Sequence, residues 1–340
     1  MALTLEDVGR QCGVSRSTVS RVINNSPLVN EVTKVRVTKA IKELNYAPNL
    51  IARSLTRNKT DTLAVTLPDI TGGVFPEILS GMDEIASERG YHLLVVFLGG
   101  ARPRTSTVEQ LITHRRCDAI VTVATTVEDS ELNSMAKQKM PVVCVLRKSP
   151  ASDIPSVLFD DAGGAMQATR LLLKQGRKKL LHVRGPKGNF DADERSRGFR
   201  AALKEAGVAF DPAYEVTGDF RRDRGMKAVQ NALDHKLVFD GIFAANDEMA
   251  IGAIEVLGEK GISIPKDVSI IGFDDIESAR FVGLSTVRVP TRELGRVAAQ
   301  LAFDLIDGKK HPETKILPTE VVERASSTPG KAIGLFKISP

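Results

Sequence analysis

The sequence lacks the features that mark secreted, membrane or metal-binding proteins. It has no tryptophan, and its three cysteines stand far apart with no C-x-x-C pair, which excludes a disulfide scaffold. No apolar run approaches the roughly 20 residues that a membrane helix needs. The N-terminus shows no basic flank followed by an apolar stretch, as a signal peptide would. We therefore expect a cytoplasmic protein with no membrane partner.

Motifs of enzyme chemistry are also missing. The patterns G-x-G-x-x-G, G-x-x-x-x-G-K, G-x-S-x-G and H-E-x-x-H do not occur. Three acidic pairs follow apolar runs, at Asp160-Asp161, Asp247-Glu248 and Asp274-Asp275. Paired carboxylates can transfer protons, but no nucleophile or metal cluster accompanies them. We expect no catalytic activity, no cofactor and no metal.

Positive charge is concentrated in the first 60 residues. This segment holds ten Lys and Arg against four Asp and Glu, whereas the whole chain of 340 residues has a net charge of only +5. A basic segment on a near-neutral body is typical of a protein with a polyanionic partner, because each neutralised phosphate releases condensed counterions. Charge alone leaves a merely solvated basic surface as the alternative.

The basic segment has the pattern of a helix-turn-helix. Thr4–Asp7 has the spacing of a capping box, and Gly13 suits the left-handed turn that ends a helix. Ser15 can cap a second, short helix whose apolar residues recur at helical spacing. A third helix follows, with Val32 and Val35 among its apolar positions. Two short helices joined by a tight turn form the helix-turn-helix motif.

Four segments of this head resemble the lactose-repressor/galactose-repressor family of bacterial transcription regulators: Thr4–Val8, Gly13–Ser15, Thr18–Asn24 and Leu44–Asn49. The resemblance implies an all-α DNA-binding head over 1–48 and a hinge helix with its linker over 49–60. It also implies that a homodimer binds a pseudo-palindromic double-stranded DNA operator, since one head reads one half-site. The tail 327–340 has no leucine heptads, so we expect a dimer and no tetramer.

The resemblance assigns the DNA contacts residue by residue. Arg16 and Ser17 begin the second helix and would read base edges in the major groove. Leu55 would wedge into the minor groove, although it could instead anchor the hinge to the body. Ser15 and Thr18 could simply cap and pack. The expected contacts are Thr4, Ser15, Arg16, Ser17, Thr18, Ser20, Arg21, Asn24, Asn25, Ala52, Arg53 and Leu55.

The rest of the chain alternates short apolar runs with helical patterns. Repeated βαβ units predict parallel sheets with helices on both faces. The units are too many for one ordinary sheet, so we expect two sheets of similar size with a ligand between them at the carboxyl ends of the strands. The predicted strands are 63–67, 91–97, 119–123, 142–146, 179–183, 241–244 and 268–272, and the predicted helices are 75–89, 105–115, 129–139, 162–175, 193–206, 222–235, 247–260 and 291–307.

For this body the resemblance implies a periplasmic-binding-protein-like α/β fold of two lobes over 61–326. Lobe 1 would comprise about 61–160 and 290–318, and lobe 2 about 161–289 and 319–326. An effector would bind between the lobes. The residues expected to contact it are Phe75, Arg147, Asn189, Asp191, Arg195, Phe220, Asn246, Asp247 and Asp274.

Carboxylates and amides that grip hydroxyls, beside an aromatic face, suit a sugar or sugar derivative as the effector. Each of these residues also has a structural alternative. Asn246 and Asp247 can cap a helix, Asp274 can belong to a turn, and Arg195 can form a structural ion pair. The aromatic residues can be ordinary core residues.

The sequence departs from the family pattern in several places. Gly72-Gly73-Val74 replaces Asn-Pro-Phe, Leu146 replaces an Asp, Asp160-Asp161 replaces Asp-Asn, and Val289 replaces a Gln. We therefore expect an effector unlike those of the best-known members, with an acidic sugar or a disaccharide both open. The expected function is repression of a carbohydrate-utilisation operon, relieved by the effector. A co-repressor-dependent regulator, or a sugar-binding protein without a DNA function, is the alternative.

Overall fold

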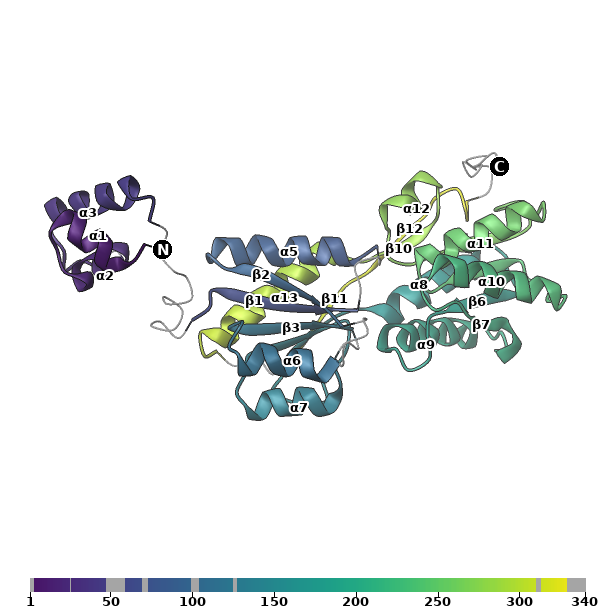
Figure 1. Cartoon of the computed structure of the whole chain (residues 1–340). Helices are drawn as coiled ribbons and strands as arrows, with labels where there is room; N and C mark the ends of the chain where they lie inside the picture. The colour runs from purple at the N-terminus through teal and green to yellow at the C-terminus, as the bar shows by residue number, and fades with distance from the viewer. Residues whose placement is uncertain are drawn as a thin grey trace. The chain divides into compact units, whose positions relative to one another are not determined.

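A computed structural model describes residues 3–24, 26–46, 59–68, 73–98, 104–124, 127–309 and 313–328. The chain divides into two compact units, Met1–Thr60 and Asp61–Pro340 (Figure 1). The expected DNA contacts at Asn25, Ala52, Arg53 and Leu55, and most of the tail, lie outside the described residues. Within the described ranges, no helix is long and apolar enough to cross a membrane, and no group of His, Cys, Asp and Glu is arranged to hold a metal ion.

The first unit is a three-helix head with the predicted helix-turn-helix. It consists of α1 (Leu5–Cys12), α2 (Arg16–Ile23) and α3 (Glu31–Glu43). The capping box of Thr4 and Asp7 is present at the start of α1, and Gly13 ends that helix with a left-handed φ of 63°. The Ser15 side chain accepts from the Thr18 N–H and caps α2. Local capping chemistry therefore sets both ends of the turn.

One helical stripe of α3 closes the core of the head. Val37 and Ala40 are buried there against residues of α1 and α2. Val32 and Val35, two of the apolar positions named for this helix, are instead 79% and 67% exposed. At 100° per residue these two positions lie about 140° and 160° around the helix from Val37, away from the buried stripe.

Lobe 1 of the second unit is a six-stranded parallel sheet with the strand order β11-β5-β4-β3-β1-β2. Helices α5 and α13 cover one face and α6 and α7 the other (Figure 1). Its elements are β1 (Thr62–Leu67), α5 (Phe75–Glu88), β2 (His92–Phe97), α6 (Arg104–Thr113), β3 (Ala119–Val123), α7 (Asp129–Lys137), β4 (Val142–Val145), β5 (Ser156–Phe159), α13 (Thr291–Ile306) and β11 (Thr314–Leu317).

Lobe 2 is a four-stranded parallel sheet with the order β7-β6-β8-β9. Helices α8 and α9 cover one face, and α10 and α11 cover the other. Its elements are α8 (Asp161–Lys174), β6 (Leu180–Arg184), α9 (Phe190–Glu205), the 3₁₀ helix η2 (Pro212–Tyr214), β7 (Glu215–Thr217), α10 (Arg222–Asp234), β8 (Gly241–Ala244), α11 (Asp247–Glu259), β9 (Ser269–Ile271) and α12 (Glu277–Phe281).

Two short strands accompany the crossings between the lobes. β10 (Thr286–Arg288) and β12 (Glu320–Val322) pair antiparallel. The chain passes between the lobes at 160–161, after β10, and between β11 and β12. The predicted alternation of strands and helices is confirmed, but the sheets are unequal in size. The strands missing from the prediction, β5, β7 and β10–β12, have only three or four residues each, too few to show a hydrophobic period.

The apolar core continues from one lobe into the other. A single cluster of buried residues includes Leu63 and Val65 of lobe 1, Val287 of the crossover strand, and Phe243 and Phe199 of lobe 2. The lobes are therefore joined by packed side chains as well as by the three crossings.

Helices α5 and α13 approach one another through glycines. A Cβ on Gly81 would lie 2.0 Å from the Arg292 carbonyl oxygen, and one on Gly295 would lie 2.1 Å from the Ile78 carbonyl oxygen. Both contacts are with backbone, which cannot move aside as a side chain can. This close crossing explains why glycine occupies the interior of two helices despite its cost in helix propensity.

We predict that Gly81→Ala destabilises the second unit by about 1–3 kcal/mol, because the new methyl group overpacks the crossing of α5 and α13. Chemical denaturation of the full chain measures this change in the free energy of unfolding. Ser87→Ala, on the exposed side of the same helix, is the matched control and should stay within about 0.5 kcal/mol of the wild type. A Gly81→Ala protein as stable as the control would contradict the steric argument.

Candidate DNA-binding surface and interlobe site

The start of α2 presents an exposed basic and hydroxyl surface. Arg16, Ser17 and Arg21 are exposed, and within the described ranges neither arginine forms an ion pair. The Ser15 hydroxyl interacts with those of Ser17 at 2.8 Å and Thr18 at 2.9 Å. The hydroxyls are thus ordered at the N-terminal end of the helix beside Arg16, whereas Arg21 lies in its last turn. Such an end suits contacts with phosphates and base edges.

The remaining expected contacts of the head have local partners. The Thr4 hydroxyl donates to the Asp7 carboxylate. Thr18 and Ser20 are half-buried. The Asn24 amide donates to the Ser20 carbonyl oxygen at 2.9 Å, near the end of α2. These four residues therefore support the helix ends, and Thr4 and Asn24 are also exposed.

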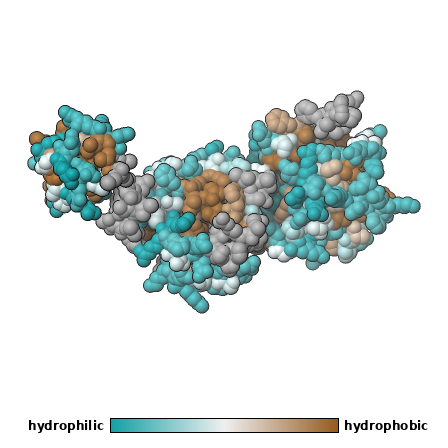
Figure 2. All heavy atoms as spheres, viewed as in Figure 1, coloured by the Kyte–Doolittle hydropathy of each residue, from teal (hydrophilic) through white to brown (hydrophobic). Residues whose placement is uncertain are grey.

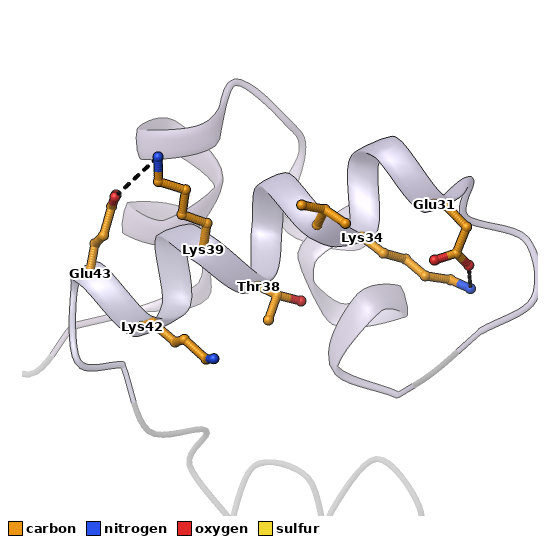
Figure 3. Close-up of a pocket in the computed structure, with 7 residues that line it drawn as sticks. Glu31, Lys34, Thr38, Lys39, Lys42 and Glu43 are labelled. Atoms are coloured by element: carbon orange, nitrogen blue, oxygen red, sulfur yellow. Dashed lines mark hydrogen bonds and ion pairs between the residues drawn. The ribbon is translucent and has the colours of Figure 1, made fainter.

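On the outer face of α3, two of the lysines are paired with glutamates. Figure 3 shows a shallow hollow along this helix, lined by Glu31, Lys34, Val35, Thr38, Lys39, Lys42 and Glu43. Lys34 pairs with Glu31 at 2.6 Å, and Lys39 pairs with Glu43 at 3.7 Å. Pairs three and four residues apart on an exposed helix stabilise it only weakly. The unpaired positive charge of the head's helices is thus more prominent on α2 than along this face.

A buried guanidinium lies at the centre of the second unit. The Nε of Arg195, on α9, donates to Asp161 Oδ1 at 2.8 Å, and its Nη1 donates to the Ala245 carbonyl oxygen at 2.5 Å. The same Nη1 lies 3.3 Å from Asp274 Oδ1. The Cζ atom stands 3.8 Å from the ring centroid of Phe273. We call the set Asp161, Asp191, Arg195 and Asp274, all from lobe 2, the interlobe site, after the position between the lobes at which the effector is expected.

Glycine brings two helices together at this site. A Cβ on Gly198, one turn after Arg195, would lie 2.2 Å from the Ala162 carbonyl oxygen. The backbones of α8 and α9 therefore touch, and the first residue of α8, Asp161, comes within reach of Arg195. Sequence reasoning did not select Asp161 or Phe273. The replacement of the family's Asn by Asp161 was the one signal that could have revealed the ion pair.

The loop after β9 is held in a strained conformation. Asp274 and Asp275 have φ angles of 111° and 56°, in the region that favours glycine. The Asp274 N–H donates to the Val287 carbonyl oxygen at 2.8 Å. The Asp275 carboxylate pairs with Arg288 at 2.8 Å and with Arg324 at 2.5 Å. These bonds to the crossover region stabilise the loop, so that Asp274 faces Arg195 while Asp275 faces the crossing strands.

The loop after β8 fixes two further predicted residues. Asp247 is fully buried and accepts from the Thr286 hydroxyl at 2.5 Å and from the Ile276 N–H at 3.0 Å. Asn246 caps α11 by accepting from the Met249 N–H, and its amide donates to the Phe220 carbonyl oxygen. Both residues therefore have structural partners.

Of three further predicted effector contacts, Asp191 belongs to the interlobe site, whereas Asn189 and Arg147 have structural partners elsewhere. Asn189 caps α9, whereas Asp191 is buried in the first turn of that helix, where its carboxyl hydrogen-bonds to that of Asp161. The guanidinium of Arg147 donates to the Val127 carbonyl and pairs with Asp129, both in lobe 1. Arg147 is thus neutralised locally, which removes the reason for expecting an acidic sugar.

Two predicted aromatic residues, Phe75 and Phe220, lie in the loops and helices around the interlobe site, and the lobes approach each other closely at Gly73. The Phe220 ring packs over Gly185, where a Cβ would lie 2.4 Å from it, and its centroid is 5.8 Å from Arg195 Cζ. Phe75 is half-buried and packs against the core of lobe 1. A Cβ on Gly73, in the loop before α5, would lie 2.8 Å from Cγ2 of Ile276 in lobe 2. A bulkier residue at 73 would have to displace the Ile276 side chain.

Burial changes the protonation of the carboxyls in this region. Desolvation is the largest cause in each case and raises the pKa of Asp161, Asp191 and Asp247. Burial likewise raises the pKa of Asp274 to about 7, although the nearby Arg195 acts against that shift. Several carboxyls thus compete for one guanidinium in a dry environment, and the uncompensated ones retain protons.

Comparisons with known proteins decide the family. The model "Bacterial regulatory proteins, lacI family" matches residues 4–49, and the "Periplasmic binding protein-like domain" matches residues 169–327. The HTH-type transcriptional regulator GalR of Escherichia coli (strain K12) is 35% identical over 331 residues, covering 96% of each chain. The chain belongs to the lacI family of bacterial regulatory proteins. Its expected resemblance, fold class and regulatory rather than enzymatic nature are confirmed.

Other members of the lacI family match over similar lengths. The ribose operon repressor of Escherichia coli (strain K12) is 32% identical, covering 95% of this chain and 99% of its own. The solved structure titled "transcriptional regulator CelR-cellobiose complex" is 30% identical with a TM-score of 0.74, and the match covers 96% of this chain and all of that one. This lacI-family chain thus matches these relatives over nearly their full length.

We predict that Asp274→Asn changes the pH dependence of stability. Since burial raises the pKa of Asp274 from near 3.8 to about 7, the folded protein keeps a proton that the unfolded chain releases above pH 4. The stabilisation is complete below pH 4 and is lost as the pH rises towards 7. The wild-type free energy of unfolding, relative to that of Asp274→Asn, should fall by about 1 kcal/mol per pH unit between pH 5 and 7.

Denaturant titrations at several pH values measure this difference. Asp153→Asn, at an exposed aspartate of lobe 1, should show no such slope. The assignment would be overturned if the difference between wild type and Asp274→Asn stayed constant, or grew, from pH 5 to 7.

Proposed function

We propose that this protein is a cytoplasmic, dimeric repressor of carbohydrate-utilisation genes, released from its operator by a small sugar-like effector. The observation that carries the proposal is the combination of two features in one chain. The head exposes Arg16 and Arg21, which have no ion-pair partner among the described residues, on a helix suited to the major groove. The body holds buried polar side chains at the carboxyl ends of parallel strands, where ligands bind in α/β folds.

The chemistry of the interlobe site favours a hydroxyl-rich effector. Asp274, Asp191 and Arg195 supply acceptors and donors, and the Phe220 ring offers a flat apolar surface. The names of the relatives point the same way, since they include a ribose operon repressor and a complex with cellobiose. We propose induction, in which the effector weakens operator binding. Co-repression, in which the effector strengthens DNA binding, is the alternative outcome of the tests below.

A second copy of the chain is required because one head reads only one half-site. Figure 2 shows hydrophobic residues gathered on lobe 1, where Figure 1 draws β1 and β2. The edge strand β2 contributes Leu93, Leu94, Val95 and Val96, all only half-buried, and Phe97, which is 49% exposed. An apolar edge of this kind is typical of a subunit interface. It supports a dimer through lobe 1.

We predict that Arg16→Ala relaxes operator preference. Loss of a bidentate contact should cost about 1–3 kcal/mol at one base pair and leave the other positions unchanged. Gel shifts with a set of single-base operator variants measure this effect. Lys42→Ala on α3 is the matched control for loss of one positive charge. If Arg16→Ala weakened binding equally on all sequences, Arg16 would be a phosphate contact.

We predict that a sugar effector releases the wild-type protein from operator DNA and that Asp274→Asn fails to respond. The asparagine keeps the size of the side chain but removes the carboxylate that would accept the effector's hydroxyls, at a cost of about 1–3 kcal/mol in binding. The assay is a gel shift at fixed salt, with and without each of a panel of sugars. Operator affinity without a sugar should be the same for both proteins. A variant that responds normally would remove Asp274 from the effector site.

A further inference from the structure

The interlobe site and the neighbouring Asp247 together contain more buried carboxyls than cations. Asp161, Asp191, Asp247 and Asp274 are all mostly buried, and Arg195 is the guanidinium that meets them among the described residues. Their charges act on one another, since Asp191 is influenced by Asp161 and Asp274 as well as by Arg195. Asp247 in turn is influenced by Asp274. Fully ionised, the four carboxyls would carry three negative charges beyond what the guanidinium neutralises.

Helix N-termini offset only part of this excess. Asp161 and Asp247 are the first residues of α8 and α11, and Asp191 lies in the first turn of α9. Each N-terminus is equivalent to about half a positive charge. Three of them together with Arg195 supply about 2.5 positive charges against four negative ones. With all four carboxyls ionised the site would lack more than one positive charge, which is why buried carboxyls in it retain protons.

Among the described residues, two buried carboxyl oxygens receive no hydrogen bond from an N–H or hydroxyl group, and the two carboxyls to which they belong hydrogen-bond to each other through a proton that one of them retains. The two oxygens are Asp191 Oδ1 and Asp161 Oδ2, on side chains that are each more than nine-tenths buried. By contrast, Asp247 is satisfied by Thr286 and Ile276. In the empty site the shared proton is the donor, and a bound cation with N–H groups can take its place.

Two of the three guanidinium nitrogens of Arg195 already have partners in the protein. Its Nε and Nη1 are already bonded to Asp161, Ala245 and Asp274, and its face is stacked on Phe273. A carboxylate or phosphate on the effector would add negative charge to a site whose buried carboxyls already outnumber its cations. An ammonium group would instead supply both the missing charge and up to three donors.

We propose that the effector carries a protonated amine, as an amino sugar does, and that Asp191 is the residue that selects it. This inference rests on the proposed function, since it names the effector class of the same site. On binding, the ammonium would pair with Asp191, and the proton that the buried carboxyl holds in the empty site would pass to the buffer. The charged groups that face Asp191 are Asp161 of α8, Arg195 of its own helix and Asp274 of the loop after β9.

The test compares matched sugars on the full-length protein. D-glucosamine, D-galactosamine and D-mannosamine are set against the parent hexoses and the corresponding hexuronic acids, at a pH where the amines are protonated. Titration calorimetry gives affinities, and repetition in buffers of different ionisation enthalpy gives the protons released. We expect at least one amino sugar to bind tenfold or more tightly than its two counterparts, with release of up to one proton.

Asp191→Asn supplies the decisive variant, and Asp193→Asn is its control on the same helix, since the Asp193 carboxylate pairs with Arg184. Asp191→Asn should weaken binding of the amino sugar at least tenfold and binding of the parent hexose less than threefold, whereas the control changes neither. The inference is overturned if no amino sugar binds better than its parent, or if Asp191→Asn affects both equally.

Failure of this inference differs from failure of the proposed function. Release from operator DNA by a neutral or acidic sugar alone would overturn the amine and leave the repressor intact. Binding of an amino sugar by a protein that does not bind operator DNA would do the reverse.

Discussion

The buried guanidinium of Arg195 is the interaction on which the body of this regulator depends. It joins Asp161 at the start of α8, Ala245 after β8 and Asp274 after β9, and it covers the Phe273 ring. These segments are far apart in the sequence, and each begins or ends an element of lobe 2. Replacing Arg195 by a neutral residue would leave the buried carboxyls of Asp161 and Asp274 without their cationic partner. Breaking a buried ion pair in this way typically lowers the free energy of unfolding by about 3–5 kcal/mol. The same ion thus organises the fold and shapes the site.

The neighbouring carboxylates connect the site to the strands that cross between the lobes. Asp275 pairs with Arg288 of β10 and Arg324 after β12, and Asp247 accepts from Thr286 of β10. A ligand that favours one arrangement of these loops also favours one arrangement of the crossing strands. In the proposed mechanism this differential affinity is what couples effector to operator, with a reciprocal energy of typically about 1–3 kcal/mol.

Local signals explain what sequence reasoning predicted, and long-range pairing explains what it missed. Helix caps, glycine turns and alternating strands and helices depend on residues close in the chain, and these predictions are confirmed. The partners of Arg195 come from three other segments, so Asp161 and Phe273 were not selected. Arg147 was expected to face the effector, but it pairs with Asp129 of the preceding helix. No periodicity reveals which cation meets which carboxylate.

The continuous apolar core has a consequence for how the body unfolds. Since buried side chains run without interruption from Leu63 through Val287 to Phe199, neither lobe can lose its packing without exposing part of the other. The two lobes should therefore melt in one cooperative transition, and a ligand bound to lobe 2 would protect the sheet of lobe 1 against heat as well. The head has a separate core around Val8 and Val37 and is free to melt independently.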